Sequence, residues 1–169
     1  IIGEYAFDSC TNLTAVTLSE NLEHMGGKAF GSCEKITKIE IPKSLEWCDS
    51  TLYDYGPFGD CTGLKTVIFE NGTTEISSHL FEKCTGLEEI NIPDSVTEIE
   101  DSAFSGCVNL SKVNIPDTVT IIGEYAFDSC TNLTNVTLSK NLEHMEGRAF
   151  GNCEKITKIE IPKSLEWCG

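Results

Sequence analysis

Phenylalanine, cysteine and aliphatic residues return along the chain in a fixed order. Seven cysteines are separated by 23, 28, 23, 23, 23 and 23 residues. A phenylalanine stands three residues before each of them, and an aliphatic residue stands three residues after it. The cysteines are Cys10, Cys33, Cys61, Cys84, Cys107, Cys130 and Cys153. The phenylalanines are Phe7, Phe30, Phe58, Phe81, Phe104, Phe127 and Phe150. Such regularity predicts one small structural unit that is used many times.

Two further apolar positions in each unit alternate with polar ones. In residues 107–130 they are Val113 and Ile115, and this period of two is typical of a short strand. Pro116 follows and predicts the end of the strand, because proline cannot donate a backbone hydrogen bond to a neighbouring strand. A second alternating segment, 119–122, predicts a short strand on the opposite side of the unit.

A single unit of 23 residues is too small to bury its own apolar side chains, whereas stacked units cover one another. Equivalent side chains then lie about 4.8 Å apart, which is the spacing of neighbouring strands. The pattern therefore predicts a solenoid of about seven stacked coils with a parallel sheet on one face, mostly strand and turn with little helix. Residues 1–169 form one array, with the phenylalanines and the cysteines as two interior ladders.

A longer repeat is superimposed on the short one. Residues 1–48 are identical to residues 121–168 at 43 of 48 positions. The five differences are Ala15/Asn135, Glu20/Lys140, Gly26/Glu146, Lys28/Arg148 and Ser32/Asn152. Near-identity over this length indicates a recent duplication of a block of five units. Because both ends of the sequence fall within the pattern, we expect the chain to be a fragment of a longer repeat protein.

The chain is strongly acidic, with a formal net charge of −15 at pH 7. Phosphate backbones and anionic lipid surfaces repel such a chain, so nucleic acid and bare membrane are poor partners. No stretch approaches the roughly 18 uninterrupted apolar residues of a transmembrane helix, so direct membrane insertion is not expected.

The nine cysteines lack the arrangement of a metal site. No two form a C-x-x-C pair, and parallel side chains in a ladder do not converge on one ion. Parallel side chains also hold their Cβ atoms farther apart than the ~3.8 Å of a disulfide. Free, buried thiols that act as small apolar side chains are the favoured interpretation, and a chain of disulfides is the alternative. Cys48 and Cys168 stand outside the ladder, where other units have aliphatic residues.

Catalytic and cation-binding residues are not evident in the pattern. The histidines, His24, His79 and His144, have no nucleophile in a local signature, and we expect them at exposed turns or edges. The acidic run at 98–101 could suggest calcium, but no glycine-containing loop supplies the roughly six to eight oxygen ligands that calcium takes. We therefore expect no catalytic residue, no metal and no cofactor.

One unit is five residues longer than the others and carries an insertion at residues 49–57. Loops on a rigid scaffold often carry binding residues, and aromatic side chains are favoured anchors at interfaces. Trp47, Tyr53 and Tyr55 are therefore candidate ligand-binding residues. The alternative is that their rings cover the bulge that the insertion makes.

Side chains between the buried aliphatic residues of the main strand are expected to face solvent on the sheet. Their charges balance: the lysines are Lys38, Lys65, Lys112 and Lys158, and the glutamates are Glu40, Glu88, Glu89 and Glu160. The excess negative charge must then lie elsewhere. This polar face without aromatic residues suits weak or multivalent contacts better than a deep apolar pocket. The candidate ligand-binding residues on it are Lys38, Lys65, Glu89, Lys112, Asn135 and Lys158.

The pattern A-F-x-x-C-x-x-L-x-x-V-x-I-P-x-x-V-x-x-I, as in residues 103–122, resembles the BspA-like leucine-rich repeats over the whole chain. The resemblance implies a leucine-rich-repeat solenoid from a large surface or secreted protein of an anaerobic bacterium or a protozoan parasite. It also implies a non-catalytic module for protein–protein contact or adhesion, with a protein or glycan on another cell or matrix as partner. An extracellular or cell-surface location follows from the same resemblance.

Three functions are compatible with these observations. An adhesion or ligand-binding array is favoured by the repeat surface and the resemblance. A structural spacer that presents other domains fits the recent duplication. An accessory module of an enzyme that lies outside the fragment is the third. Because no polar end cap is evident, the coils are also expected to associate end to end.

Overall fold

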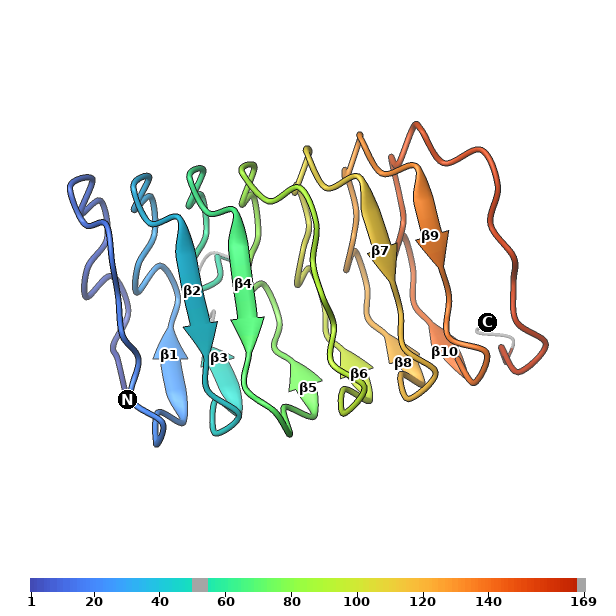
Figure 1. Cartoon of the computed structure of the whole chain (residues 1–169), viewed down its shortest axis with the longest axis horizontal. Helices are drawn as coiled ribbons and strands as arrows, with labels where there is room; N and C mark the ends of the chain where they lie inside the picture. Colours follow the sequence, from blue (N-terminus) through green and yellow to red (C-terminus); the bar gives the residue numbers. More distant parts are fainter. Residues whose placement is uncertain (50–54, 167–169) are drawn as a thin grey trace.

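The computed structural model describes residues 1–49 and 55–166, and of residues 47–49 the backbone only. The chain winds into coils that stack along one axis, with the first and last coils at opposite ends (Figure 1). Within the described ranges there are ten short strands and no helix. The predicted solenoid of strands and turns is confirmed. Each coil is named here by the cysteine of its repeat.

One long side of the stack carries the strands that follow each cysteine. They are β2 (Lys38–Ile41), β4 (Thr66–Phe69), β7 (Lys112–Asn114) and β9 (Asn135–Thr137). β2 pairs with β4 and β7 pairs with β9, both in parallel. We call the outer surface of these strands and of the equivalent segments 14–18, 88–92 and 157–161 the β-face.

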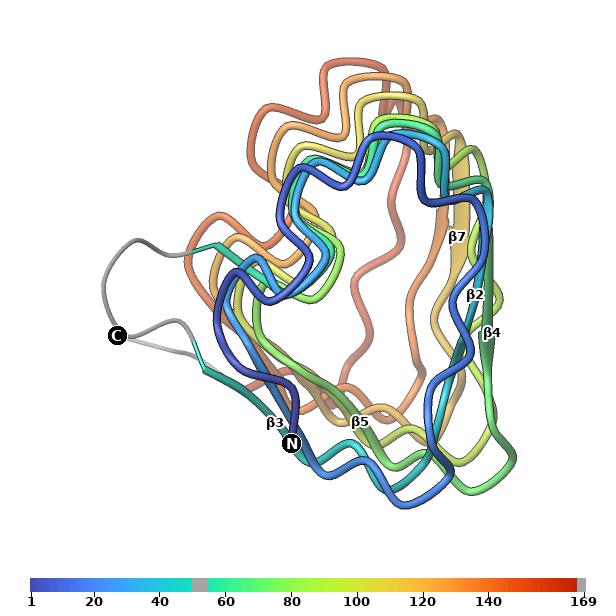
Figure 2. The same cartoon turned by 90° about the vertical axis from the view of Figure 1, so that its left-hand side faces the viewer.

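A second set of strands lies across the coils from β2 and β4 (Figure 2). They are β1 (His24–Gly26), β3 (Trp47–Asp49), β5 (Glu75–Ile76), β6 (Glu98–Ile99), β8 (Ile121–Ile122) and β10 (His144–Met145). β5, β6, β8 and β10 form one parallel sheet, and β1 pairs with β3. The strand predicted at 119–122 is shorter than expected, because the N–H of Val119 closes a turn with the carbonyl of Pro116 at 3.0 Å.

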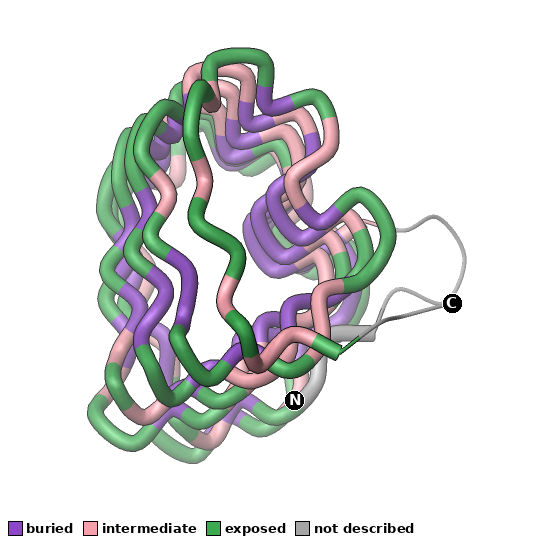
Figure 3. The backbone as a smooth tube through the Cα atoms, turned by 90° about the vertical axis from the view of Figure 1, so that its right-hand side faces the viewer, coloured by how far each residue is buried: buried purple, intermediate pink, exposed green. Residues whose placement is uncertain are grey.

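The phenylalanine rings form the predicted ladder through the interior. Successive ring centroids lie 5.1, 5.4, 5.9, 5.7, 5.2 and 5.1 Å apart, with interplanar angles of at most 18°. The fully buried rings are Phe58, Phe81, Phe104 and Phe127. Buried residues line the inside of the coils between exposed ones (Figure 3). The interior position of the ladder is therefore confirmed, and only the rings of the end coils are partly open to solvent.

The turn segment before each cysteine has a backbone that the apolar pattern does not reveal. Two residues in most turns adopt left-handed φ. One stands five residues before the cysteine, and the other stands immediately before it. The former, with φ of 51–58°, are Tyr5, Lys28, His79, Ser102, Tyr125 and Arg148. The latter, with φ of 53–72°, are Ser9, Ser32, Asp60, Lys83, Gly106, Ser129 and Asn152.

This alternating backbone ties neighbouring coils together. In the Cys130 coil, the N–H groups of Tyr125, Phe127 and Ser129 donate to carbonyl oxygens of the next coil at 2.7–3.1 Å. Every second N–H therefore points along the stacking axis, while those between them close turns within the coil. The hydrogen bonds between coils thus compensate for the unfavourable backbone conformation.

Ser102→Gly is expected to raise the free energy of unfolding by about 0.5–1 kcal/mol, because left-handed φ costs a non-glycine residue roughly 1–2 kcal/mol and glycine's unfolded-state freedom offsets part of the gain. Ser102 has φ 54°. Urea unfolding followed by circular dichroism measures the change. Ser105→Gly, outside the left-handed region, is the control and should lose about 0.5–1 kcal/mol. Destabilisation by both substitutions would contradict this account.

Candidate functional site

The β-face presents alternate residues of each strand to solvent. In β2 and β4 the first and third residues are exposed and the second and fourth are buried. Lys38 and Glu40 therefore point outward from β2, as Thr66 and Ile68 do from β4. This is the geometry that the period of two predicts.

A hollow of about 340 Å³ lies near the middle of the β-face, and we call it the central hollow. The residues that line it are Lys65, Thr66, Val67, Glu89, Ile90, Asn91, Lys112 and Asn114. Three of the predicted ligand-binding residues, Lys65, Glu89 and Lys112, come together there. They belong to three successive coils, so their meeting depends on the stacking.

The backbone ladder of the β-face is interrupted beside the central hollow, as it also is between segment 14–18 and β2 and between β9 and segment 157–161. No backbone hydrogen bond among the described residues joins β4 to segment 88–92. Segment 88–92 is instead connected to the following coil, through the parallel bridge between Glu89 and Lys112. The main-chain groups that face this gap from both sides consequently have no partner across it.

The phenylalanine rings of the ladder are farthest apart at the level of this gap. The ring centroids of Phe58 and Phe81 are 5.9 Å apart, against 5.1 Å at both ends of the ladder. Phe69 ends β4 at a position where other coils have an aliphatic residue such as Ile115. Its buried ring meets Phe81 edge-on, with centroids 6.2 Å apart and an interplanar angle of 79°. The larger side chain explains the wider spacing of these two rings.

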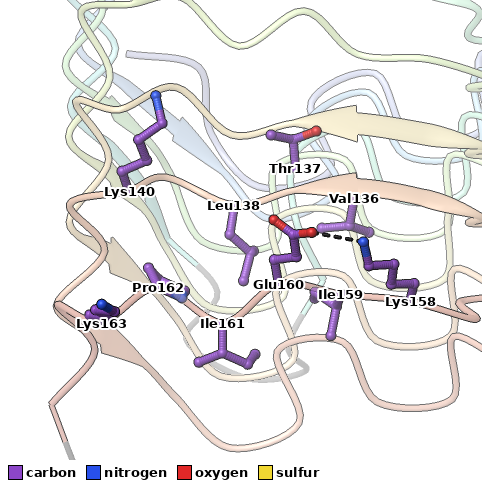
Figure 4. A pocket seen from close by; sticks show the side chains of 10 residues that line it. All are labelled: Val136, Thr137, Leu138, Lys140, Lys158, Ile159, Glu160, Ile161, Pro162 and Lys163. Carbon is purple, nitrogen blue, oxygen red and sulfur yellow. Dashed lines mark hydrogen bonds and ion pairs between the residues drawn. The ribbon is translucent and has the colours of Figure 1, made fainter.

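Two lysines of the β-face are neutralised within their own strand segments. Lys38 Nζ lies 2.7 Å from Glu40 Oε1, and Lys158 Nζ lies 2.8 Å from Glu160 Oε1 (Figure 4). The hydrogen bond and the charge of Glu160 raise the pKa of Lys158, and those of Lys158 lower the pKa of Glu160. In solvent, such pairs contribute little to stability, but they do reduce the charge offered to a ligand.

The charged side chains of the central hollow are not neutralised in this way. Across the described part of the chain, Lys65, Glu89 and Lys112 have neither an ion pair nor a side-chain hydrogen bond. Asn114 stands two residues after Lys112, where Glu40 and Glu160 stand after the paired lysines. The side-chain amide of Asn114 carries no charge, so it does not neutralise the positive charge of Lys112.

The other predicted β-face residues lie apart from the central hollow. Lys38 lines a hollow of about 400 Å³ towards the first coil. Lys158 lines one of about 490 Å³ at the last coil (Figure 4). Asn135 is the register partner of Lys112, and its Nδ2 donates to Thr134 Oγ1 at 3.0 Å. The structure thus unites only half of the six residues.

Tyr55, at the root of the insertion, packs against the scaffold. Lys28 Nζ and Lys83 Nζ lie 4.2 and 4.7 Å from its ring centroid. Two cation–π contacts to a half-buried ring favour the alternative in which the aromatic residue covers the insertion's base. Tyr53 lies outside the described residues, and the side chain of Trp47 is not described.

The histidines differ from the expectation of exposed positions. All three are half-buried. His79 Nδ1 lies 3.4 Å from Glu82 Oε2, and the two side chains are 17% and 13% exposed. The expectation was wrong because the turn and edge positions pack against neighbouring coils, which the repeat pattern does not show.

The ladder cysteines are free, and all except Cys10 of the first coil are buried. The thiols also do what an apolar side chain cannot, since six of them donate to the phenylalanine carbonyl of the preceding coil at 3.1–3.3 Å. In the Cys107 coil the acceptor is Phe81 O. Burial raises the pKa of Cys107 to about 12. Thiols of this kind are poor nucleophiles and poor metal ligands.

Carboxylates gather on the opposite strands. Glu75 and Glu98 are register partners in β5 and β6. Burial and then the charge of Glu100 raise the pKa of both. No group of three or more histidine, cysteine or acidic residues in the described ranges is arranged to hold a metal ion.

Glu98→Gln is expected to raise the free energy of unfolding at pH 7 by a few tenths of a kcal/mol, a value reduced for solvent screening. The raised pKa means that Glu98 favours the fold when protonated and loses that contribution as pH rises through its folded pKa. Thermal unfolding should therefore separate variant and parent above about pH 5 and not near pH 3. Glu70→Gln is the control with opposite sign, because hydrogen bonds from Lys43 lower the pKa of Glu70.

The first coil exposes apolar side chains around a hollow of about 510 Å³. Ile1 is 88% exposed and Phe7 is 45% exposed. End-to-end association of the chain remains a prediction. Light scattering should show a mass that rises with concentration, and Phe7→Gln should weaken this rise. A constant monomer mass at high concentration would remove the prediction.

The family of the repeat emerges from comparison with known proteins. The chain matches the family model described as BspA type Leucine rich repeat region, in six copies over residues 1–56 and 51–168. A comparison with curated proteins finds no match. Among the described residues, no helix is long and apolar enough to cross a bilayer.

Several solved structures are similar to this chain. A leucine rich cell surface protein from Faecalibacterium prausnitzii aligns with a TM-score of 0.68 and 30% identity, over 90% of this chain and 41% of that one. A leucine-rich repeat protein from Bacteroides ovatus aligns with a TM-score of 0.66 and 26% identity, over 97% and 47%. The T. pallidum Leucine Rich Repeat protein, at 23% identity and a TM-score of 0.56, supports the fold alone. This chain spans less than half the length of the first two.

Proposed function

The chain belongs to the family of BspA-type leucine-rich repeats, and from this premise we propose that it binds a protein partner through its β-face. The observation that carries the proposal is the meeting of Lys65, Glu89 and Lys112 at the central hollow, unpaired within the described residues. Charges that a rigid surface presents without internal partners are suited to steering and orienting a charged partner.

Catalysis has no support in the described geometry. The buried thiols donate to carbonyl oxygens, and burial raises their pKa, whereas a nucleophile requires a neighbouring base or a lowered pKa. The central hollow is lined mostly by charged and other polar residues, unlike the mainly apolar pocket of a small-molecule site. The function we propose is therefore that of a non-catalytic interaction module.

An adhesive role at a cell surface or outside the cell extends the same proposal. The similar protein from F. prausnitzii is described as a cell surface protein. A shallow polar face suits weak contacts that gain strength from many repeats in one array. The partner would then be a protein, or a glycan-bearing protein, on another cell or matrix.

A structural spacer is the second candidate. It is favoured by the identity of residues 1–48 and 121–168 at 43 of 48 positions. Each added coil lengthens the stack by about 4.8 Å whatever its surface residues are, so duplication changes reach without creating a new face. A spacer does not require the residues of the β-face.

The test is binding of the chain to immobilised matrix proteins, mucins and whole cells, compared with a triple variant in which Lys65, Glu89 and Lys112 are replaced by glutamine. One partner should bind the parent about tenfold or more tightly than the variant, as expected when central contacts are removed. Binding that is equal for the two proteins would exclude the β-face, and no binding at all would favour the spacer.

A control variant distinguishes the loss of β-face contacts from a general effect of removing charged residues. Glu23, Glu46 and Glu143 are exposed on the opposite side of the coils. Their replacement by glutamine changes three charged residues but leaves the β-face intact. This variant should bind like the parent, and a comparable loss would indicate a general charge effect.

A further inference from the structure

We propose that the central hollow is a receiving site for an acidic side chain on an extended segment of the partner. Lys65 and Lys112 bind the carboxylate, and the main chain beside the gap takes further hydrogen bonds. This assignment rests on the proposed binding through the β-face and specifies its chemistry. It draws on the lining charges, the asparagines at two glutamate positions and the gap in the ladder.

The lining charges favour an anion at this place. Lys65 and Lys112 contribute two positive charges and Glu89 one negative charge, so the hollow carries a net charge of +1. The whole chain carries −15, which makes this a local exception. Glu88 lies nearby in sequence but does not line the hollow. Lys38 and Lys158 are each paired with a glutamate of their own strand segment. A carboxylate of the partner would take the same role for Lys65 and Lys112.

The amides of the hollow suit the same ligand. Asn91 and Asn114 occupy the positions of Glu40 and Glu160 in the paired coils. A side-chain amide donates to a carboxylate without repelling it, whereas a glutamate there would compete for the lysine. The two asparagines thus remove a competing carboxylate at these positions, and Glu89 is the one carboxylate that lines the hollow.

The gap in the ladder offers main-chain hydrogen-bonding groups to the partner, but its width limits the size of what can enter. Neighbouring strands lie about 4.8 Å apart, and the Phe58 and Phe81 rings of the two coils that border the gap are 5.9 Å apart, so the gap is narrow. A whole strand inserted between them would need about twice that spacing. The partner segment must therefore lie over the face, with only the tip of a side chain reaching the gap.

A peptide fits these residues better than a sugar. The residues that line the hollow include no aromatic ring on which a sugar could stack. They include three formal charges of alternating sign across neighbouring coils, which a peptide side chain can complement. An oligosaccharide at the same place is the alternative that the experiment must distinguish.

The experiment uses capped peptides as probes and the 15N-labelled chain as target. The probes are acetyl-Thr-Val-Glu-Val-Thr-amide and its analogues with glutamine or lysine in place of glutamate. The glutamate peptide should shift the backbone amides of residues 66–69 and 88–92, with a Kd on the order of 1 mM. The glutamine peptide should bind about threefold more weakly and the lysine peptide more weakly still.

Variants assign the preference to the hollow. Replacing Lys65 and Lys112 together by glutamine should abolish the difference between the glutamate and glutamine peptides. Replacing Lys38 and Lys158 together is the matched control and should leave the difference intact.

Several results would overturn the proposal. They are equal shifts from all three peptides, shifts confined to other parts of the β-face, or chitotetraose shifting these amides where the peptides do not. Failure here is distinguishable from failure of the proposed function. If a partner from the binding panel perturbs the β-face away from the central hollow, the interaction module stands without this site. If no partner perturbs the β-face, the proposed function itself fails.

Discussion

Phe104→Ala is expected to lower the free energy of unfolding by about 3–5 kcal/mol, as truncation of a buried aromatic residue does. The ring is fully buried, with centroids 5.7 Å from Phe81 and 5.2 Å from Phe127. Its loss removes a stacking partner from both neighbours, and each stacked pair contributes about 0.5–1.5 kcal/mol beyond burial. The cavity cannot close, because Phe104 N donates to Ala126 O at 2.8 Å and holds the coils at their spacing.

Guanidinium unfolding measures this loss, and Phe7→Ala provides the comparison. Phe7 is 45% exposed and stacks on one ring, Phe30, so its truncation should cost about 1 kcal/mol. Equal losses at Phe104 and Phe7 would mean that the ladder does not stabilise the stack. Amide exchange should lose protection first in the Cys84, Cys107 and Cys130 coils, since each coil is stabilised by its neighbours.

The periodic positions of the sequence determine most of the fold. Phe104 and Cys107 recur in every unit with the same offset, and each copy is covered by the equivalent residue of the next coil. A repeated pattern therefore specifies both the burial and the register of the stack. This is why the ladders, the parallel strands and the outward lysines could be predicted without coordinates.

The turns could not be predicted in the same way. Tyr125 and Arg148 share left-handed φ, although neither residue type favours it. The conformation is imposed by hydrogen bonds to the adjacent coil, which a single unit lacks. Gly106 and Asn152 are the residue types that signal such a backbone, and they occur too rarely here for the signal to stand out.

The candidate site was predictable in part. The alternation in the strands places Lys65, Glu89 and Lys112 on one face, but it does not show that they share a hollow. The hollow depends on the interrupted ladder, and the strand pattern recurs in paired and unpaired coils alike, so it does not reveal where the backbone pairing stops. In the sequence Phe69 is simply another apolar residue at the end of a strand, and its edge-on contact with Phe81 follows from the size of its ring.

The effects of the differences between the two copies, residues 1–48 and 121–168, can be explained only from the side chains that they contact. Arg148 Nη2 lies 3.3 Å from Asp128 Oδ1, and Asn152 Nδ2 donates to the same oxygen at 3.3 Å. Asp8 is the equivalent of Asp128, with lysine and serine at the two partner positions. Among the described residues, Asp8 Oδ1 is buried without a hydrogen-bond partner. The second copy thus has partners for a carboxylate oxygen that the first copy leaves unsatisfied.

Gly56→Ala is expected to lower the free energy of unfolding by about 2–3 kcal/mol, because the added methyl group has no room. A Cβ at Gly56 would lie 1.7 Å from the carbonyl oxygen of His79 and 2.3 Å from its carbonyl carbon. These are backbone atoms, and His79 cannot withdraw because its N–H donates to Asp101 O at 2.9 Å. The Gly56 carbonyl also accepts from Lys28 N at 3.1 Å, so the glycine is held from the other side as well.

Gly147→Ala is the matched control for Gly56→Ala. The nearest atom to its added methyl group would be a side-chain oxygen of Glu124 at 3.7 Å, which is an ordinary contact. Denaturant unfolding should show little change for this control. Unchanged stability of Gly56→Ala would mean that the Cys61 and Cys84 coils do not approach as closely as described. The expected loss would support their close approach at the turns.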